Sequence, residues 1–178
     1  MSHFTLCEYS PEKSNTALGK INFLKKNCTS FNNPSIKPFL VVFENGLGKI
    51  KGDYINEMKK IYKLEEEFYF LVPVSTCDYF VNKIKQWISN EFANAVDISS
   101  CFTENQPIDM ARLGTNAEES LTRSLVISND LINNTINKLF IADDVYSTGT
   151  SIRVYKNKIQ ELFNNEIEFS YGTLIKTQ

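Results

Sequence analysis

The sequence predicts an α/β fold, with a mostly parallel central sheet and helices on both faces. Two apolar runs, FYFLV at 68–72 and LFIA at 139–142, are typical of buried strands, and residues with helical periodicity follow each of them. Strands that are apolar throughout occur mainly in parallel sheets, which helices cover on both sides. We therefore expect a Rossmann-like, three-layer domain that binds ligands at the carboxyl ends of its strands.

Length and composition predict one ordinary globular domain. The chain has 178 residues, of which 42% are hydrophobic and 22% charged, so it can bury a sizeable core. A formal net charge of −2 argues against nucleic acid or an anionic membrane as a partner. No apolar run reaches the length of a membrane span, and no signal peptide is recognised, so we expect a cytoplasmic protein.

The cysteines predict neither a zinc site nor a disulfide framework. Cys7, Cys28, Cys77 and Cys101 are widely separated, and the chain has a single histidine, His3. In a reducing cytoplasm these four residues are expected to be free thiols.

The first third of the chain is predicted to form two helices and one strand. Apolar residues recur at helical spacing over 13–27 and again over 54–62. Between them, after the break NNPSIKP at 32–38, the run FLVVF at 39–43 is predicted to be a buried strand. The Asn-Gly pair at 45–46 could form the corner of a hairpin.

From residue 66 onwards, strands and helices alternate. The predicted order is strand 68–72, helix 80–88, a weak strand in 92–98, an irregular segment 99–116, helix 117–126, strand 139–142, helix 152–163 and strand 166–175. Two loops that follow strands carry small polar residues, at 73–78 and 143–151. Because parallel strands end at the same edge of a sheet, these two loops should lie side by side.

A glycine-containing turn at the start of the last predicted helix favours phosphate binding. Its five residues are Ser147, Thr148, Gly149, Thr150 and Ser151. The first backbone N–H groups of a helix point outward at its positive dipole end, and the glycine allows a ligand to approach the backbone closely. The alternative is that Thr150 or Ser151 only caps the helix.

Two adjacent acids, Asp143 and Asp144, come just before this turn, separated from it by two residues. Neighbouring carboxylates repel each other, and a cation or hydroxyl donors relieve the repulsion. A ribose diol or Mg²⁺ would supply either, so the pattern favours a sugar-phosphate ligand. The alternative is a pair of acids that are solvated or bound to a neighbouring helix.

The segment 139–151, LFIADDVYSTGTS, resembles the motif with which type I phosphoribosyltransferases bind 5-phosphoribosyl 1-pyrophosphate (PRPP). The resemblance covers four apolar residues, two acids, two further residues and the Ser/Thr-Thr-Gly-x-Ser/Thr turn. It implies that Asp143 and Asp144 bind the ribose hydroxyls and are catalytic. It implies that residues 147–151 hold the 5-phosphate. Mg²⁺ would be bound through PRPP, with Asp143 or Asp144 as a protein ligand.

The same resemblance gives roles to two earlier segments. The loop after strand 68–72 would bind pyrophosphate, through Ser75, Thr76, Cys77 and Asp78. The alternative is a routine strand–helix connection capped by Ser75 or Thr76. The irregular segment 99–116 corresponds to a mobile loop that closes over the reaction. Within it, Arg112 would act as a catalytic cation against pyrophosphate charge, and the alternative is a solvated surface arginine.

The wider arrangement is loosely similar to the competence-protein ComF group, through KIKGDY at 49–54 and TNAEESLTRS at 115–124. One domain spans 1–178, with its core in 66–178. The role of residues 1–65 is open, and they could contribute the hood that selects the acceptor. Dimers are common among relatives, so a homodimer is one expectation.

The resemblance implies transfer of the phosphoribosyl group from PRPP to a small nitrogenous acceptor, with release of pyrophosphate. Ser147 stands where enzymes for 6-oxopurines usually carry an Asp, and the lysine-rich loop of orotate enzymes is absent between Lys85 and Lys138. The acceptor is therefore left open. A non-catalytic PRPP or nucleotide sensor is the alternative, and a phosphorelay receiver ranks third.

Overall fold

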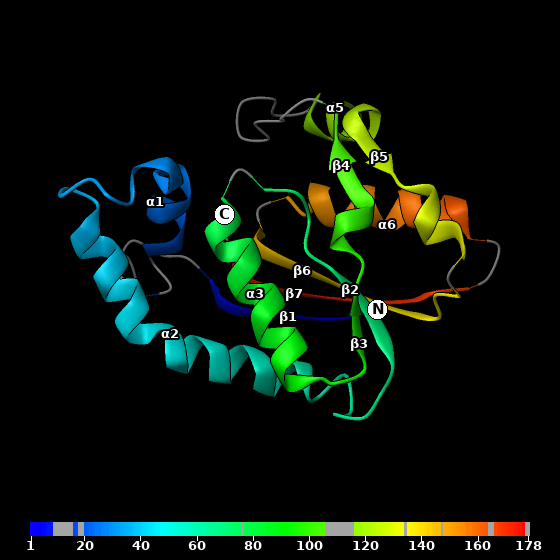
Figure 1. The fold of residues 1–178 in the computed structure, drawn as a ribbon, viewed down its shortest axis with the longest axis horizontal. Helices are drawn as coiled ribbons and strands as arrows, with labels where there is room; N and C mark the ends of the chain where they lie inside the picture. The colour runs from blue at the N-terminus through cyan, green and yellow to red at the C-terminus, as the bar shows by residue number, and fades with distance from the viewer. Residues whose placement is uncertain are drawn as a thin grey trace.

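The computed structural model describes residues 1–8, 16–17, 20–75, 77–105, 116–133, 135–146, 148–163 and 166–176 (Figure 1). Five parallel strands form the central sheet, in the order β1-β7-β6-β2-β3. They are β1 (Ser2–Glu8), β2 (Phe68–Leu71), β3 (Ala95–Asp97), β6 (Lys138–Tyr146) and β7 (Glu168–Lys176). A separate antiparallel pair consists of β4 (Phe102–Glu104) and β5 (Leu125–Ile127). The predicted α/β class with a parallel sheet is confirmed.

Helices cover both faces of this sheet, as Figure 1 shows. One layer contains α1 (Ile21–Lys26), α2 (Lys37–Met58) and α3 (Asp78–Glu91). The other contains α5 (Ala117–Ser124) and α6 (Thr150–Leu162), beside the β4–β5 pair. Short 3-10 helices are η3 (Cys28–Ser30), η4 (Ser99–Cys101) and η6 (Asn129–Asn133).

The central strand β6 has a hydrophobic core on each side. Phe140 and Ala142 pack against the layer of α2 and α3, whereas Leu139 and Ile141 pack against that of α6. Successive side chains of a strand point to opposite faces, so an apolar run such as 139–142 fills both cores at once. This burial on both faces is the physical reason why the run could be recognised from sequence.

Residues 39–43 and 45–46 were predicted wrongly, because they lie inside the 22-residue helix α2 and not in a strand and a hairpin corner. Phe43, Ile50 and Tyr54 are buried at helical spacing, whereas Val41 and Val42 are 44% and 40% exposed. A short apolar run does not distinguish a strand from a buried helix. Here the burial of one helical face places the run in a helix.

Other elements begin or end differently from their predictions. Strand β1 was not predicted, although it pairs along its length with β7. Helix α1 begins at Ile21, and residues 9–15 and 18–19 lie outside the described part of the chain. The helix predicted over 117–126 ends at Ser124, where strand β5 follows. The strands predicted at 68–72, 139–142 and 166–175, and the helices at 80–88 and 152–163, are confirmed with shifted ends.

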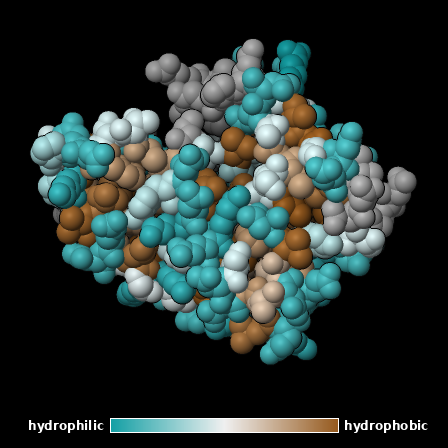
Figure 2. Space-filling view, viewed as in Figure 1, coloured by the Kyte–Doolittle hydropathy of each residue, from teal (hydrophilic) through white to brown (hydrophobic). Residues whose placement is uncertain are grey.

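The surface carries exposed apolar side chains where α1 and the start of α2 lie together. Figure 2 shows brown side chains at this end of the molecule, and exposed apolar residues there include Phe23, Val41 and Val42. Single exposed apolar residues are normal on protein surfaces.

Within the described residues, no helix has the length and apolar character needed to cross a membrane.

Gly172 in β7 leaves room for two aromatic rings, and its replacement by Ala should destabilise the fold. A Cβ atom at Gly172 would lie 2.4 Å from Cζ of Phe4 and 2.7 Å from Cζ of Phe140. We expect Gly172→Ala to lower the free energy of unfolding by about 1–3 kcal/mol. Gly48→Ala is the matched control, because a Cβ there meets nothing within 4 Å. Because Gly48 lies in the interior of α2, Gly48→Ala should raise the free energy of unfolding, measured in urea, by about 0.5–1 kcal/mol. Equal effects of the two changes would contradict this packing.

Candidate functional site

The two loops with small polar residues lie next to each other, as expected, because their strands are neighbours. Strand β2 pairs with β6 in parallel, with Phe70 opposite Phe140 and Leu71 opposite Ile141. The loop after β2 also contacts α6, since the backbone N–H of Val74 donates to the Tyr155 hydroxyl at 2.9 Å. Tyr155 belongs to α6 and is buried. The start of α6 and the loop after β2 therefore form one site region.

The turn after β6 places Gly149 at the N-cap of α6. Gly149 has φ 70° and ψ 14°, a left-handed conformation that side chains disfavour. The alternative that Thr150 or Ser151 caps the helix does not hold, because Gly149 occupies that position and no side chain caps it. The first helical hydrogen bond runs from Arg153 N–H to Gly149 O at 3.0 Å. The amides of residues 150–152 precede it, as phosphate binding requires.

Arg153 holds this turn in place from the first part of α6. Its Nη1 donates to the Thr148 carbonyl at 2.6 Å, and its Nη2 donates to Thr150 Oγ1 at 3.2 Å. The same guanidinium pairs with Glu118 of α5 at 2.8 Å. Thr148 and Thr150 share a further hydroxyl hydrogen bond at 2.7 Å. These contacts connect Thr148 and Thr150 to α6 and, through Arg153, to α5.

The acid pair lies at the carboxyl end of β6, and Asp144 is almost completely buried. Only 3% of the Asp144 side chain is exposed, and its Oδ1 accepts a hydrogen bond from Lys25 Nζ of α1. Its Oδ2 has no hydrogen-bond partner within the described part of the chain. Asp143, which is half-buried, accepts the Asp144 backbone N–H on Oδ1 at 2.8 Å. Among the described residues this oxygen of a buried carboxylate has no donor, which favours a donor supplied by a ligand.

Both carboxylates raise the pKa of Lys25, and the Asp144 carboxylate also raises the pKa of Asp143. Burial and the neighbouring Asp144 carboxylate raise the pKa of Asp143 to about 7, although Lys25 opposes the shift. Burial lowers the pKa of Lys25, but Asp144 and Asp143 outweigh burial, so the pKa is raised overall. Within the part of the chain that the structure describes, Lys25 is the cation that offsets the charge of both acids. This arrangement favours a ligand that brings hydroxyl donors or a metal ion.

The raised pKa of Asp143 predicts a pH dependence of stability. Because the folded state holds this proton more tightly than the unfolded chain, the stabilisation is present below the ordinary pKa and is lost as pH rises towards about 7. We expect the free energy of unfolding of the wild type, relative to Asp143→Asn, to fall between about pH 4 and about pH 7. Urea unfolding of both proteins across this range measures it. A difference that stays flat or rises would contradict the assignment.

Lys25 was not among the residues predicted for the site. Its side chain is 30% exposed and reaches Asp144, which lies 119 residues further along the chain. Only the packing of α1 beside the sheet brings the two together, through Ile21 and Leu24, which are fully buried in the core. No local pattern could have indicated this contact.

A disulfide joins Cys28 in η3 to Cys77, which corrects the expectation of four free thiols. Their Cα atoms are 5.6 Å apart, although the residues are separated by 49 positions. Within the described residues, Cys7 and Cys101 are free. The bond connects the segment that carries Lys25 to the loop after β2.

The predicted pyrophosphate loop is only partly available to a ligand. Cys77 is fully buried, its sulfur is in the disulfide, and its backbone N–H donates to Ser75 Oγ at 3.2 Å. Cys77 occupies the N-cap of α3 without a side-chain cap, and the exposed Asp78 is the first helical residue. Cys77 is therefore a structural residue in this state, not a free donor. Three other predicted site residues, Thr76, Arg112 and Ser147, lie outside the described residues.

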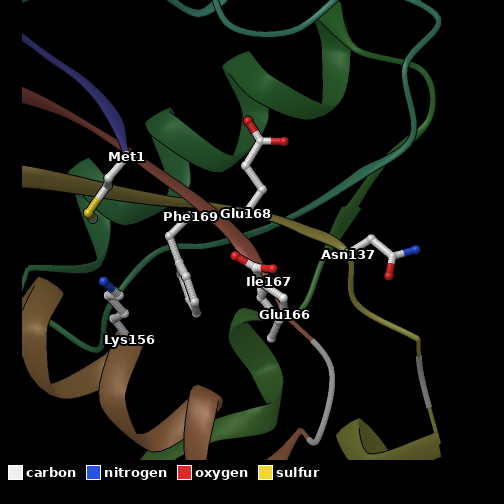
Figure 3. Close-up of a pocket in the computed structure, with 7 residues that line it drawn as sticks. All are labelled: Met1, Asn137, Lys156, Glu166, Ile167, Glu168 and Phe169. Carbon is white, nitrogen blue, oxygen red and sulfur yellow. The ribbon is translucent and has the colours of Figure 1, made fainter.

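A cavity of about 410 Å³ lies at the opposite end of the sheet (Figure 3). It is lined by Met1, Asn137, Lys156, Glu166, Ile167, Glu168 and Phe169. These residues lie around the amino ends of β6 and β7 and along α6. The cavity is therefore separate from the acid pair and from the turn at Gly149.

The described residues contain no group of three or more His, Cys, Asp or Glu side chains that could hold a metal ion. A metal at this edge of the sheet would thus depend on the ligand for most of its oxygen atoms. In comparisons with known proteins, no family model and no curated protein matches this chain.

Proposed function

We propose that this protein binds PRPP and transfers its phosphoribosyl group to a small nitrogenous acceptor, with release of pyrophosphate. One observation carries the proposal: two acids lie near the carboxyl end of β6, and the helix that follows this strand, α6, has as its N-cap a glycine at φ 70°. The free acceptor on the buried Asp144 supports a ligand with hydroxyl donors at this position.

Different residues of the site would bind different parts of PRPP. The amides of residues 150–152 and the hydroxyls of Thr148 and Thr150 would bind the 5-phosphate at the positive end of α6. Asp143 and Asp144 would accept hydrogen bonds from the ribose hydroxyls. Asp144 can do so fully only if Lys25 releases its Oδ1.

Mg²⁺ fits this site as an ion that enters with the ligand. Magnesium prefers oxygen ligands and usually keeps several waters, so one or two carboxylates and the pyrophosphate oxygens suffice. The unpartnered Oδ2 of Asp144 and the carboxylate of Asp143 are the protein oxygens that could contribute. When bound, the ion would neutralise the charge of the leaving pyrophosphate.

The reaction would break the bond between the anomeric carbon and the pyrophosphate oxygen, and would form a bond from that carbon to the acceptor nitrogen. Pyrophosphate leaves with the electron pair, and the acceptor nitrogen loses a proton. No side-chain nucleophile is needed, because the protein positions the two reactants and stabilises charge. A cytoplasmic location and a homodimer remain part of the proposal. The first is an expectation from the sequence, and the second rests on the resemblance to phosphoribosyltransferases.

Calorimetric titration of the reduced protein with PRPP, with and without Mg²⁺, tests the proposal. We expect binding that strengthens with Mg²⁺, followed by pyrophosphate release in a screen of nitrogenous acceptors. Gly149→Ala should weaken binding, since a Cβ at φ 70° strains the turn by about 1–2 kcal/mol. Absence of binding at millimolar PRPP by a folded protein would refute the proposal.

A non-catalytic PRPP or nucleotide sensor is the second candidate, and two observations favour it. Lys25 already pairs with Asp144, and Cys77 of the predicted pyrophosphate loop is held in a disulfide. A sensor would bind PRPP without releasing pyrophosphate in the presence of any acceptor. The acceptor screen therefore separates the two functions.

A further inference from the structure

The disulfide Cys28–Cys77 lies beside the candidate site and connects the segments that flank it. Cys28 follows Lys25 by three residues, about one helical turn, and Lys25 pairs with Asp144. Cys77 ends the loop after β2, whose neighbouring strand β6 carries the acid pair. One covalent bond therefore joins the element that covers Asp144 to the loop next to Asp144.

In this arrangement a ligand cannot reach Asp144. The side chain is 3% exposed, and Lys25 Nζ occupies its Oδ1. Hydrophobic packing of Ile21 and Leu24 holds α1 in place in either redox state. The disulfide adds a covalent restraint at the end of α1 that is nearest to Lys25. Without that bond, only an ion pair and side-chain packing resist withdrawal of Lys25 from the acids.

We propose that Cys28–Cys77 is a redox latch, which holds Lys25 on Asp144 when oxidised and allows sugar-phosphate binding when reduced. The proposal rests on the proposed function, because it concerns regulation of the same site. The disulfide holds Lys25 on Asp144, and a thiol reductant can break this disulfide. In the reduced protein the ligand then competes with Lys25 for the Asp144 carboxylate.

The chemistry of release follows from the exposure of the two sulfur-bearing residues. Cys28 is partly exposed, whereas Cys77 is fully buried, so a thiolate of a dithiol reductant attacks the sulfur of Cys28. The bond between the two protein sulfurs breaks, and Cys77 leaves as a thiolate that then takes up a proton. Cys77 lies at the N-terminus of the 14-residue helix α3, whose dipole stabilises the departing thiolate. The second thiol of the reductant then attacks the mixed disulfide, which frees Cys28 and leaves the reductant oxidised.

The test compares PRPP binding by the oxidised and the reduced full-length protein, with Mg²⁺ present and dithiothreitol as the reductant. We expect the oxidised form to bind PRPP at least tenfold more weakly. Cys28→Ser should bind PRPP with the affinity of the reduced wild type, and dithiothreitol should not change that affinity. Cys101→Ser is the matched control, because Cys101 is free, and it should keep the redox response. Circular dichroism establishes that each variant is folded.

Hydrogen exchange of residues 20–31 provides a second readout that needs no ligand. Exchange in this segment should be faster in the reduced wild type and in Cys28→Ser than in the oxidised protein. Equal PRPP affinity in both redox states would overturn the latch and leave the proposed function standing. Absence of PRPP binding in both states would refute the proposed function and the latch together. Unchanged exchange on reduction would overturn the latch even if PRPP binds.

Discussion

Asp144→Asn is expected to weaken PRPP binding by about 10- to 100-fold, the range that corresponds to the loss of one charge-assisted hydrogen bond of about 1.5–3 kcal/mol. Asp144 is the buried member of the acid pair, and its Oδ2 has no hydrogen-bond partner among the described residues. Asn keeps one oxygen but lacks the charge that strengthens a hydrogen bond from a ribose hydroxyl. Calorimetry on reduced protein with Mg²⁺ measures the change.

Two further variants separate binding from folding. Asp53→Asn removes an exposed carboxylate from α2 and should leave the affinity for PRPP unchanged. Asp144→Asn also leaves Lys25 without its partner, so the double variant Lys25→Met/Asp144→Asn tests whether the unpaired lysine causes the loss. If either single or double variant at Asp144 bound PRPP as tightly as the wild type, the acid pair would not be part of the site.

Loss of the Cys28–Cys77 bond is expected to lower the free energy of unfolding by about 4 kcal/mol. The bond closes a loop of 49 residues, and the chain-entropy relation gives about this value for a loop of that length. A domain of this kind has a total stability of about 5–15 kcal/mol, so the variant should still fold. Urea unfolding of Cys28→Ser against the oxidised wild type measures the difference.

The control for this prediction is chemical as well as genetic. Dithiothreitol should destabilise the wild type by the same amount, and should have no effect on Cys28→Ser. Cys101→Ser, which removes a free thiol, should leave this response to dithiothreitol unchanged. If the wild type unfolded at the same urea concentration with and without reductant, the two cysteines would not be bonded in solution.

The parts of the fold that could be predicted from sequence depend on local signals. Strands β2 and β6 carry apolar residues on both faces because helices cover both faces of the sheet. A run of consecutive apolar residues in the sequence therefore indicates such a strand. The turn at Gly149 is also local, since a residue at φ 70° before a helix favours glycine. Gly149 lies at the start of α6 as predicted, whereas the two acids, which were predicted in the loop after the strand, lie inside β6.

The parts that could not be predicted depend on distant contacts. Lys25 meets Asp144 across 119 residues, and Cys28 meets Cys77 across 49, so neither pairing leaves a local signal. Residues 39–43 of α2 were predicted to be a strand because a short apolar run does not by itself distinguish a strand from a buried helix. Gly46 in that helix lies where a Cβ would be 2.4 Å from Ala17 Cβ, so close packing explains a glycine that resembled a turn residue.

Hydrogen exchange of the amides at residues 150–152, with and without PRPP and Mg²⁺ in the reduced protein, tests the proposed phosphate site at the start of α6. These amides precede the first hydrogen bond of α6, and we propose that they bind the 5-phosphate. We predict that PRPP slows their exchange, and that Asp144→Asn reduces the effect. Exchange that is unchanged at these amides, at a PRPP concentration that saturates binding elsewhere, would contradict a phosphate site at the start of α6.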